Sequence, residues 1–586
     1  RKRSALPWVA FVLIHGPYWA LVLGFKCWLF AKHLPGLGLI AFVDGMWPQV
    51  ATLGALSTVG YIGLVLTRRY LVAGAIAQAF LVVLLAVMQL PLLYGLDQSG
   101  SAVRWGLAAW WIEWNGTAPD GDWYMMQRLI AGGCLVGLVM LLGLLGPQRR
   151  RVAAAAAAGL ALLGVSCIGP VGGAVPRYLA RDPIVYTIQS NFGVGQQWDR
   201  MRNRPVHSGM RLAGEVTEPL NVVVIFLESV GLNATSLSVD GPDTTPFLAE
   251  LASRSVTADR AYVVVPSTYK AHVAVLCGVE PYFTGDREIF DRPFDFPCLP
   301  GELRQRGYDT AYFTSSGRDM LGWAAMVKHL GYDSFFGYED MDTEGFDYAN
   351  MWAYEDDIML EPSREWLSSR SGPFVATYMV CAPHYEYLAP PRYGHRAYVA
   401  DDEHNRYLNA VHYTDRFIEN LMSQYEALGL AERTVFVIVG DHGEAFGEHM
   451  PRQHNAVPYE EALRVPLILH QPGRWPDGHA AEGLRSQLDV TPTLTGLLGL
   501  QLDPSSVQGS SLTGPSQRDE VLASCLYTHT CGAVIEPRFK FVHHFGDRPD
   551  ELFDLEADPA ERVPLHDPAR AESMRAGLLD WYANGL

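Results

Sequence analysis

The chain has 586 residues, of which 49% are hydrophobic and 18% are charged, and its formal net charge is -18 at pH 7. The charges are unevenly divided, because residues 1–180 hold 13 Lys and Arg against 5 Asp and Glu, whereas the remainder holds 32 against 58. This distribution excludes a soluble single-domain protein and a nucleic-acid-binding protein with a basic face, and the apolar and aromatic content excludes a disordered chain.

Several apolar segments near the N-terminus approach or exceed the roughly 20 residues that a helix needs to cross a bilayer. They are residues 7–31, 48–67, 70–94, 126–146 and 152–174. Basic clusters precede the first segment and separate the second from the third and the fourth from the fifth. Under the positive-inside rule, these clusters place the N-terminus in the cytoplasm. We therefore predict an α-helical membrane domain of five spans over residues 1–174.

The composition changes after the last predicted span. The spans contain almost no ionisable residues, which disfavours a channel or a proton-coupled transporter and favours a membrane anchor. Residues 175–218 are mixed and polar, and we predict a linker with surface helices there. An odd number of spans then places residues 219–586 outside the cytoplasm as a separate domain.

Short apolar runs alternate with helical patterns in this outer domain. The runs are residues 222–227, 310–314, 374–380, 434–439 and 465–469. Between the last runs, Leu408, Val411, Ile418 and Leu421 recur at helical spacing. This alternation predicts an α/β domain whose parallel sheet is covered on both faces. Ligands bind such sheets at the carboxyl ends of the strands, so the residues that follow each run are the candidates for a site.

Two of these runs end in residues that suit a metal ion. Glu228 follows the run at 222–227, and Asp441 and His442 follow the run at 434–439. Strand-end carboxylates often only cap a neighbouring helix. Together, however, two carboxylates and an imidazole at one sheet edge predict a divalent metal with oxygen and nitrogen ligands.

A hydroxyl segment precedes a helix-like stretch that ends at Cys277 and Gly278. Ser267 and Thr268 lie at its start. A hydroxyl at a helix N-terminus beside a metal ion can be activated as a nucleophile, although the same residue can also serve as a plain N-cap. The segment is therefore a candidate nucleophile site.

The sequence resembles the alkaline phosphatase/sulfatase superfamily and, within it, the membrane-anchored phosphotransferases, which include lipoteichoic acid synthases and phosphoethanolamine transferases. The resemblance covers roughly residues 220–560. It rests on these strings: VVVIFLES, PSTYKAHVAVLCG, KHLGYDSFF, APHYEY, TVFVIVGDHGEAFGEH, QHNAVPYEEALRVPLILHQPG, QLDVTPTLTGLLG and LFDLEADP. It implies an extracytoplasmic α/β domain of alkaline phosphatase/sulfatase type.

The resemblance also implies site residues. One divalent ion, Zn²⁺ or Mn²⁺ with Mg²⁺ as a further candidate, would be bound by Glu228, Thr268, Asp441 and His442. Thr268 would be the nucleophile and form a phospho-threonine intermediate, with Ser267 as the alternative. The substrate phosphate would contact two histidines, His384 and His454. Weaker candidates for substrate contacts are Lys270, Arg318, His449 and His395.

Several activities fit this resemblance. A sulfatase needs a Cys or Ser that is converted to formylglycine, and Thr268 cannot undergo that conversion. Phosphoglycerol transfer is favoured by the KHLGYD string, although the Trp-x-Arg unit typical of lipoteichoic acid synthases is replaced by Leu321-Gly322-Trp323, with Arg318 nearby. Phosphoethanolamine transfer to lipid A or another glycan is the closest alternative. A phosphodiesterase, a sulfatase-like hydrolase and an inactive sensor are further alternatives.

The implied reaction takes place at a membrane. Thr268 would attack phosphatidylglycerol or phosphatidylethanolamine, release diacylglycerol and pass the headgroup phosphate to a hydroxyl of a glycan or glycolipid. We expect a multi-pass protein of a bacterial cytoplasmic (inner) membrane, with the catalytic domain in the periplasm or at the cell exterior and with no nucleic-acid partner. An oxidising compartment suits disulfides, and we expect the pairs Cys277–Cys298 and Cys525–Cys531, with Cys381 free.

Overall fold

The structure is a computed structural model of the chain. It describes residues 2–33, 39–66, 76, 78–80, 82, 209–281, 294, 296–449, 452–526, 531–545 and 549–584. The chain divides into two compact units, one formed by Arg1–Trp198 with Gly546–Pro549 and the other by Asp199–Phe545 with Asp550–Leu586.

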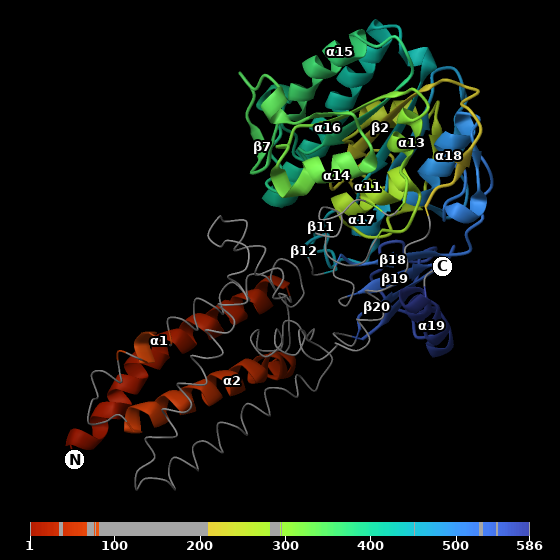
Figure 1. The fold of residues 1–586 in the computed structure, drawn as a ribbon. Helices are drawn as coiled ribbons and strands as arrows, with labels where there is room; N and C mark the ends of the chain where they lie inside the picture. Colours follow the sequence, from red (N-terminus) through yellow and green to blue (C-terminus); the bar gives the residue numbers. More distant parts are fainter. Residues whose placement is uncertain are drawn as a thin grey trace. The chain divides into compact units, whose positions relative to one another are not determined.

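Two long helices of the first unit occupy the first two predicted spans. They are α1 (Lys2–His33) and α2 (Leu39–Leu66), shown in red and orange in Figure 1. Among the residues that the structure describes, no helix meets the combined length and hydropathy that a membrane span requires. The prediction of five spans is therefore not confirmed. The predicted spans at 126–146 and 152–174 lie outside the described residues, as do most of 70–94 and of the predicted linker.

An eight-stranded sheet forms the centre of the second unit, in the order β15-β3-β14-β10-β2-β9-β5-β6. The five strands from β10 to β6 run parallel to their neighbours, whereas β14 is antiparallel to β10 and to β3. The bounds are β2 Asn221–Leu227, β3 Val256–Thr257, β5 Asp309–Thr314, β6 Ser334–Phe336, β9 Phe374–Val380, β10 Thr434–Gly440, β14 Leu467–His470 and β15 His479–Ala480.

Four of the predicted strands are confirmed as parallel strands of this sheet, namely β2, β5, β9 and β10. The fifth prediction, a parallel strand over 465–469, is wrong in two respects. Pro466 separates a short strand β13 (Arg464–Val465) from β14, and β14 runs antiparallel to β10. An apolar run shows that a strand is buried, but it does not encode the direction of that strand.

Helices cover both faces of the sheet (Figure 1). Alternate residues of β2, such as Val222, Val224 and Phe226, pack against helices of one face, and Val223, Ile225 and Leu227 pack against those of the other. The first face carries α11 (Thr268–Cys277), α13 (Leu299–Arg304), α14 (Trp323–Leu330) and α18 (Val490–Leu497). The second carries α10 (Pro246–Ala252), α15 (Leu360–Ser368) and α16 (Asp402–Ala427). The predicted helix around Leu408–Leu421 is confirmed as part of α16.

Smaller elements complete the unit. A four-stranded antiparallel sheet is formed by β18 (Val521–Ser524), β19 (Gly532–Ile535), β20 (Phe539–His543) and β21 (Glu551–Asp554), and α19 (Pro568–Asn584) packs on it. The other short pairings involve β1 (Leu212–Ala213), β4 (Ala261–Tyr262), β7 (Tyr348–Asn350), β8 (Ala353–Tyr354), β11 (Ala445–Phe446), β12 (Arg452–Gln453), β16 (Arg485–Ser486) and β17 (Gln501–Leu502).

Both expected disulfides are present, Cys277–Cys298 and Cys525–Cys531. The first joins the end of α11 to the residue before α13, and Cys381 is free and buried, as predicted.

Candidate active site

The carboxyl ends of β2 and β10 place two carboxylates side by side. The strands are adjacent and parallel, with Leu227 opposite Gly440, so Glu228 and Asp441 leave the same edge of the sheet. Ser229 adopts a left-handed backbone conformation (φ 57°), and its amide donates to Asp441 Oδ1 at 2.8 Å. The two strand ends are therefore joined at the position where the sequence predicted a ligand site.

His442 completes a group of three buried ligand atoms. Its Nδ1 donates to the Gly443 carbonyl at 2.9 Å, which leaves Nε2 as the atom with a lone pair. Nε2 lies 3.5 Å from Asp441 Oδ2 and 3.7 Å from Glu228 Oε1. Both Nε2 and Asp441 Oδ2 are buried, and neither has a hydrogen-bond partner among the residues that the structure describes. Buried polar atoms without partners are costly, and a ligating histidine commonly donates its other N–H to a backbone carbonyl, so this donor set fits a divalent metal ion.

Burial also shifts the titration of this group. Burial, with a smaller contribution from Asp441, raises the pKa of Glu228 to about 7, and burial raises the pKa of Asp441 to about 7. Burial, followed by the neighbouring His454, lowers the pKa of His442 to about 4. Burial disfavours the ionised forms of Glu228 and Asp441. A bound cation would lower the pKa of both carboxyl groups, because its positive charge stabilises the ionised forms.

Thr268 lies next to this group. It is the first residue of α11, and the preceding Ser267 has the extended backbone of an N-cap. Thr268 Oγ1 donates to Glu228 Oε2 at 3.2 Å. The structure thus brings together the four residues predicted as ligands, and it places the Thr268 hydroxyl at a helix N-terminus, where the backbone favours negative charge.

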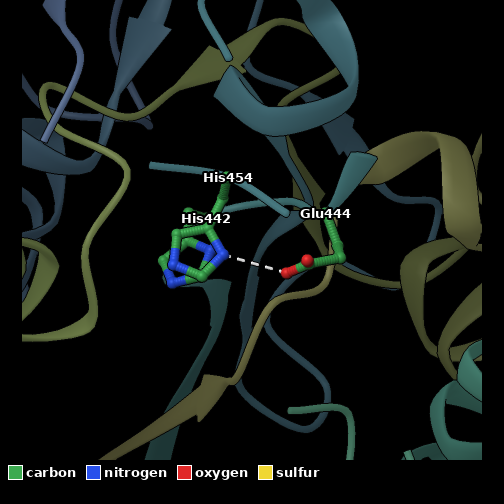
Figure 2. Close-up of side chains that lie close together, drawn as sticks. All are labelled: His442, Glu444 and His454. Atoms are coloured by element: carbon green, nitrogen blue, oxygen red, sulfur yellow. Dashed lines mark hydrogen bonds and ion pairs between the residues drawn. The ribbon is translucent and has the colours of Figure 1, made fainter. Parts of the chain in front are cut away.

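A second buried group adjoins the first (Figure 2). The imidazole rings of His442 and His454 are stacked with centroids 3.8 Å apart, and His454 Nδ1 lies 2.9 Å from Glu444 Oε2. Tyr387 donates its hydroxyl to Glu444 Oε1 at 3.2 Å. Burial raises the pKa of Glu444 to about 7 and, together with His384, lowers the pKa of His454 to about 3.

Sequence reasoning did not identify Glu444 or Tyr387 as site residues. Glu444 stands two residues after His442 in the same Asp-His-Gly-Glu string, which is the one sequence signal for it. Its partnership with His454 depends on the pairing of β11 with β12, which returns the chain to the sheet edge. Periodicity in the sequence does not reveal that pairing.

His384 lies in the loop that follows β9. Its Nδ1 donates to the Tyr385 carbonyl at 3.0 Å, and its ring lies 4.8 Å from that of Trp352. Its electrostatic influence extends to both buried groups, where it lowers the pKa of Glu228 and that of Glu444. The loop is fixed by the buried Asp356, which accepts from the amides of Cys381 and Ala382 at 2.8 and 3.2 Å.

The four weaker candidates for substrate contacts lie in environments that differ from that of the metal-ligand group. Lys270 is fully buried on α11, and His395 is exposed. Arg318 binds Asp340 at 3.0 Å. Both ring nitrogens of His449 are engaged, Nδ1 with Glu461 at 2.8 Å and Nε2 with the Glu561 carbonyl at 3.0 Å, which indicates a structural role for this histidine.

Comparison with known proteins gives matches of two kinds. Residues 220–500 match the sulfatase family, and residues 447–581 match the C-terminal region of N-sulphoglucosamine sulphohydrolase. The lipoteichoic acid synthase-like protein YvgJ of Bacillus subtilis is 27% identical over 301 residues, which are 48% of this chain and 48% of that relative. The ulvan-active sulfatase of Formosa agariphila is 24% identical over 339 residues, which are 51% of this chain and 65% of that relative. The chain thus spans about half the length of YvgJ and less than two thirds of the sulfatase.

Solved structures show the same fold. The crystal structure of the lipoteichoic acid synthase LtaP from Listeria monocytogenes aligns with a TM-score of 0.51 and 18% identity, covering 66% of this chain and 98% of that one. A protein of the alkaline phosphatase superfamily from Vibrio parahaemolyticus aligns with a TM-score of 0.51 and 19% identity, covering 66% of this chain and 94% of that one. At these identities the likeness concerns the fold.

Proposed function

Because the chain carries a sulfatase-family domain of alkaline phosphatase superfamily type, we propose that it is a metal-dependent phosphotransferase that uses Thr268 as its nucleophile. One observation carries this proposal. The Thr268 hydroxyl stands 3.2 Å from Glu228 at the N-terminus of α11, beside two buried ligand atoms, Asp441 Oδ2 and His442 Nε2, that lack hydrogen-bond partners. This arrangement combines a nucleophile with a donor set that suits a divalent cation.

The residues that would hold the metal ion are Glu228, Thr268, Asp441 and His442. Oxygen and imidazole ligands of this kind suit Zn²⁺ or Mn²⁺. When bound, such an ion lowers the pKa of a coordinated hydroxyl and stabilises negative charge on phosphoryl oxygens. The remaining chemistry comes from the side chains of the chain itself.

The reaction consists of two displacements at phosphorus. In the first, a bond forms between Thr268 Oγ1 and the phosphorus of a phospholipid headgroup, and the bond to the diacylglycerol oxygen breaks. In the second, an acceptor hydroxyl attacks the same phosphorus and releases Thr268. His384 and His454 contact the phosphoryl oxygens through Nε2, which donates to them when the imidazole is doubly protonated. Glu444 holds His454 Nδ1 at 2.9 Å and so fixes the orientation of that ring.

The residue at the nucleophile position separates the two kinds of relative. Sulfatases use a formylglycine made from Cys or Ser, and threonine has a β-methyl group that prevents this conversion. Phosphoglycerol transfer from phosphatidylglycerol is favoured, since lipoteichoic acid synthases are among the similar proteins. Phosphoethanolamine transfer is the second candidate, and slow hydrolysis would result where water replaces the acceptor. A dedicated phosphodiesterase is the third.

We further propose that the N-terminal part anchors the catalytic domain to a bacterial cytoplasmic membrane, with the domain in the periplasm or at the cell exterior. The apolar N-terminal segments and the basic clusters between them support this placement. The two disulfides of the catalytic unit suit an oxidising compartment. The donor lipid would then lie in the outer leaflet, and the acceptor would be a glycan or glycolipid.

Mass spectrometry of the full chain after incubation with phosphatidylglycerol or phosphatidylethanolamine tests this proposal. We expect a glycerol-phosphate adduct on the peptide that contains Thr268, and no adduct in the Thr268→Ala variant. The matched variant Ser267→Ala tests the alternative hydroxyl and is expected to keep the adduct. A phosphoethanolamine adduct would establish the second candidate. An adduct on Ser267, or full turnover by Thr268→Ala, would overturn the nucleophile assignment.

A further inference from the structure

Aromatic and apolar side chains, four of them exposed and Trp352 half-buried, lie on a hairpin and a loop that meet at His384. The hairpin is that of β7 and β8, labelled at β7 in Figure 1, and the loop is the one after β9. We call this cluster the hairpin rim, and its members are Tyr348, Met351, Trp352, Tyr385 and Leu388. The exposed fractions are 53% for Tyr348, 48% for Met351, 40% for Tyr385 and 43% for Leu388. Apolar side chains gathered at a surface in this way often mark a binding site.

The hairpin rim is held in place by buried hydrogen bonds. Asn350 accepts from the amides of Trp352 and Ala353 at 3.0 Å each, which fixes the turn of the hairpin. The same side chain donates to the Cys381 carbonyl at 2.8 Å, three residues before His384. Leu388 in turn donates its amide to the Ala349 carbonyl at 3.0 Å. The hairpin and the His384 loop therefore form one preorganised surface.

This surface is continuous with the reaction site. The Trp352 ring lies 4.8 Å from that of His384, and the Tyr385 ring lies 5.6 Å from that of Tyr387. Tyr387 donates to Glu444, which belongs to the second buried group of the site. The hairpin rim therefore adjoins His384 directly and Glu444 through Tyr387.

The charge around the hairpin rim limits what can bind there. Residues 339–357 contain eight Asp and Glu and no Lys or Arg. Some of these carboxylates are paired, since Asp340 binds Arg318 and both Glu355 and Asp357 bind Arg392. Others are exposed at the surface, namely Asp342, Glu344 and Asp347. The negative potential disfavours an anionic lipid surface, a sulfated glycan and any other polyanion.

We propose that the hairpin rim binds uncharged sugar rings of the acceptor glycan. The C–H face of a sugar ring packs on the electron-rich face of an aromatic ring, and sugar hydroxyls donate hydrogen bonds to carboxylates. Aromatic side chains among exposed carboxylates (Asp342, Glu344 and Asp347) offer both contacts and disfavour anionic competitors. This inference rests on the proposed transfer to a glycan, and it names the surface and the charge class of the acceptor.

Direct binding of the full chain to an array of neutral, amino-substituted and sulfated oligosaccharides tests this inference without turnover. The Thr268→Ala protein is used as the parent so that no transfer occurs. We expect it to bind neutral oligosaccharides, and we expect the double variant Tyr348→Ala/Tyr385→Ala to bind them about tenfold more weakly or worse. The matched control is Val563→Ala/Leu565→Ala, which alters two exposed side chains of the C-terminal region and should not change binding.

A charge-reversal variant provides a second test of this inference. The triple variant Asp342→Lys/Glu344→Lys/Asp347→Lys should gain binding to sulfated oligosaccharides, because it removes the repulsion. Binding confined to sulfated glycans in the parent protein, no binding to any neutral glycan, or equal loss in the control variant would overturn the inference. If neutral glycans bind through the hairpin rim but no Thr268 adduct forms with either lipid, the proposed function fails while the glycan surface stands.

Discussion

Two charge-rich regions of the catalytic unit are in contact in the fold and differ in how their charges are satisfied. In the first, Asp441 Oδ2 and His442 Nε2 have no hydrogen-bond partner. In the second, Lys540 Nζ lies 3.1 Å from Glu460 and 2.9 Å from Glu561, and His449 lies 2.8 Å from Glu461. The second region supplies its own counter-charges, whereas these two ligand atoms of the first have no hydrogen-bond partner among the residues that the structure describes. The difference teaches that burial alone does not identify a candidate metal site, and that the partners of the buried ligand atoms have to be considered as well.

The two regions are in direct contact. The Gly443 amide donates to the Ala462 carbonyl at 2.9 Å, and a Cβ at Gly443 would lie 2.0 Å from the Glu461 carbonyl oxygen. A glycine is therefore required between His442 and Glu444. The second region, which we call the self-paired region, therefore supports the segment after β10 that carries Asp441 and His442.

The largest expected effect is a loss of activity when the first region, which holds Asp441 and His442, is altered. Asp441→Asn should lower kcat/KM at least about a thousandfold, because it removes a charged ligand. The metal-free variant should be at least as stable as the metal-free parent, since a neutral amide relieves a carboxylate whose pKa burial raises to about 7. Steady-state kinetics and thermal unfolding after chelation measure the two effects. Strong destabilisation of the Asp441→Asn protein would show that Asp441 stabilises the fold, and it would contradict the difference between the two regions.

The self-paired region should respond in the opposite way. Lys540→Met leaves the buried Glu561 and the half-buried Glu460 without this cation, which should cost about 3–5 kcal/mol of unfolding free energy. The double variant Lys540→Met/Glu561→Gln should recover part of this loss. Denaturant unfolding of the chelated protein checks both values. A loss below about 1 kcal/mol for Lys540→Met would show that the ion pairs there are not needed for stability.

His449 gives a smaller, pH-dependent effect. Burial lowers its pKa, but hydrogen bonding and charge from Glu461 outweigh burial and raise the pKa from 6.5 to about 9. A pKa raised on folding contributes stability that is fully present below about pH 6.5 and is lost as the pH rises through about 9. We expect the parent to lose about 2 kcal/mol relative to His449→Gln across this window. Thermal unfolding of both proteins from pH 6 to 9.5 measures this loss. An equal loss of stability in the two proteins would contradict the assignment of the effect to His449.

The sequence predicted the parts of the fold that depend on continuous apolar runs. The strands β2, β5, β9 and β10 were each visible as a short buried run, and the ligand residues follow from the rule that parallel strands end at one edge. The direction of β14 was not predictable, because hydrophobicity does not distinguish parallel from antiparallel pairing.

Contacts that depend on the folding of loops were also beyond the sequence. Glu444 meets His454 only because β11 pairs with β12, and Tyr387 reaches Glu444 from the loop after β9. His449 illustrates the reverse case, since a histidine near the ligand string proves to be bound by Glu461 and by the Glu561 carbonyl. Residue type and spacing identify candidates, but the partner of each ring nitrogen decides its role.

Metal analysis of the purified full chain tests the central claim most directly. Elemental analysis by mass spectrometry should find about one Zn²⁺ or Mn²⁺ per chain in the parent and in His449→Gln, and none in Asp441→Asn. Equal metal content in Asp441→Asn and the parent, or loss of the metal in His449→Gln alone, would contradict the assignment of the unmatched group as the metal site.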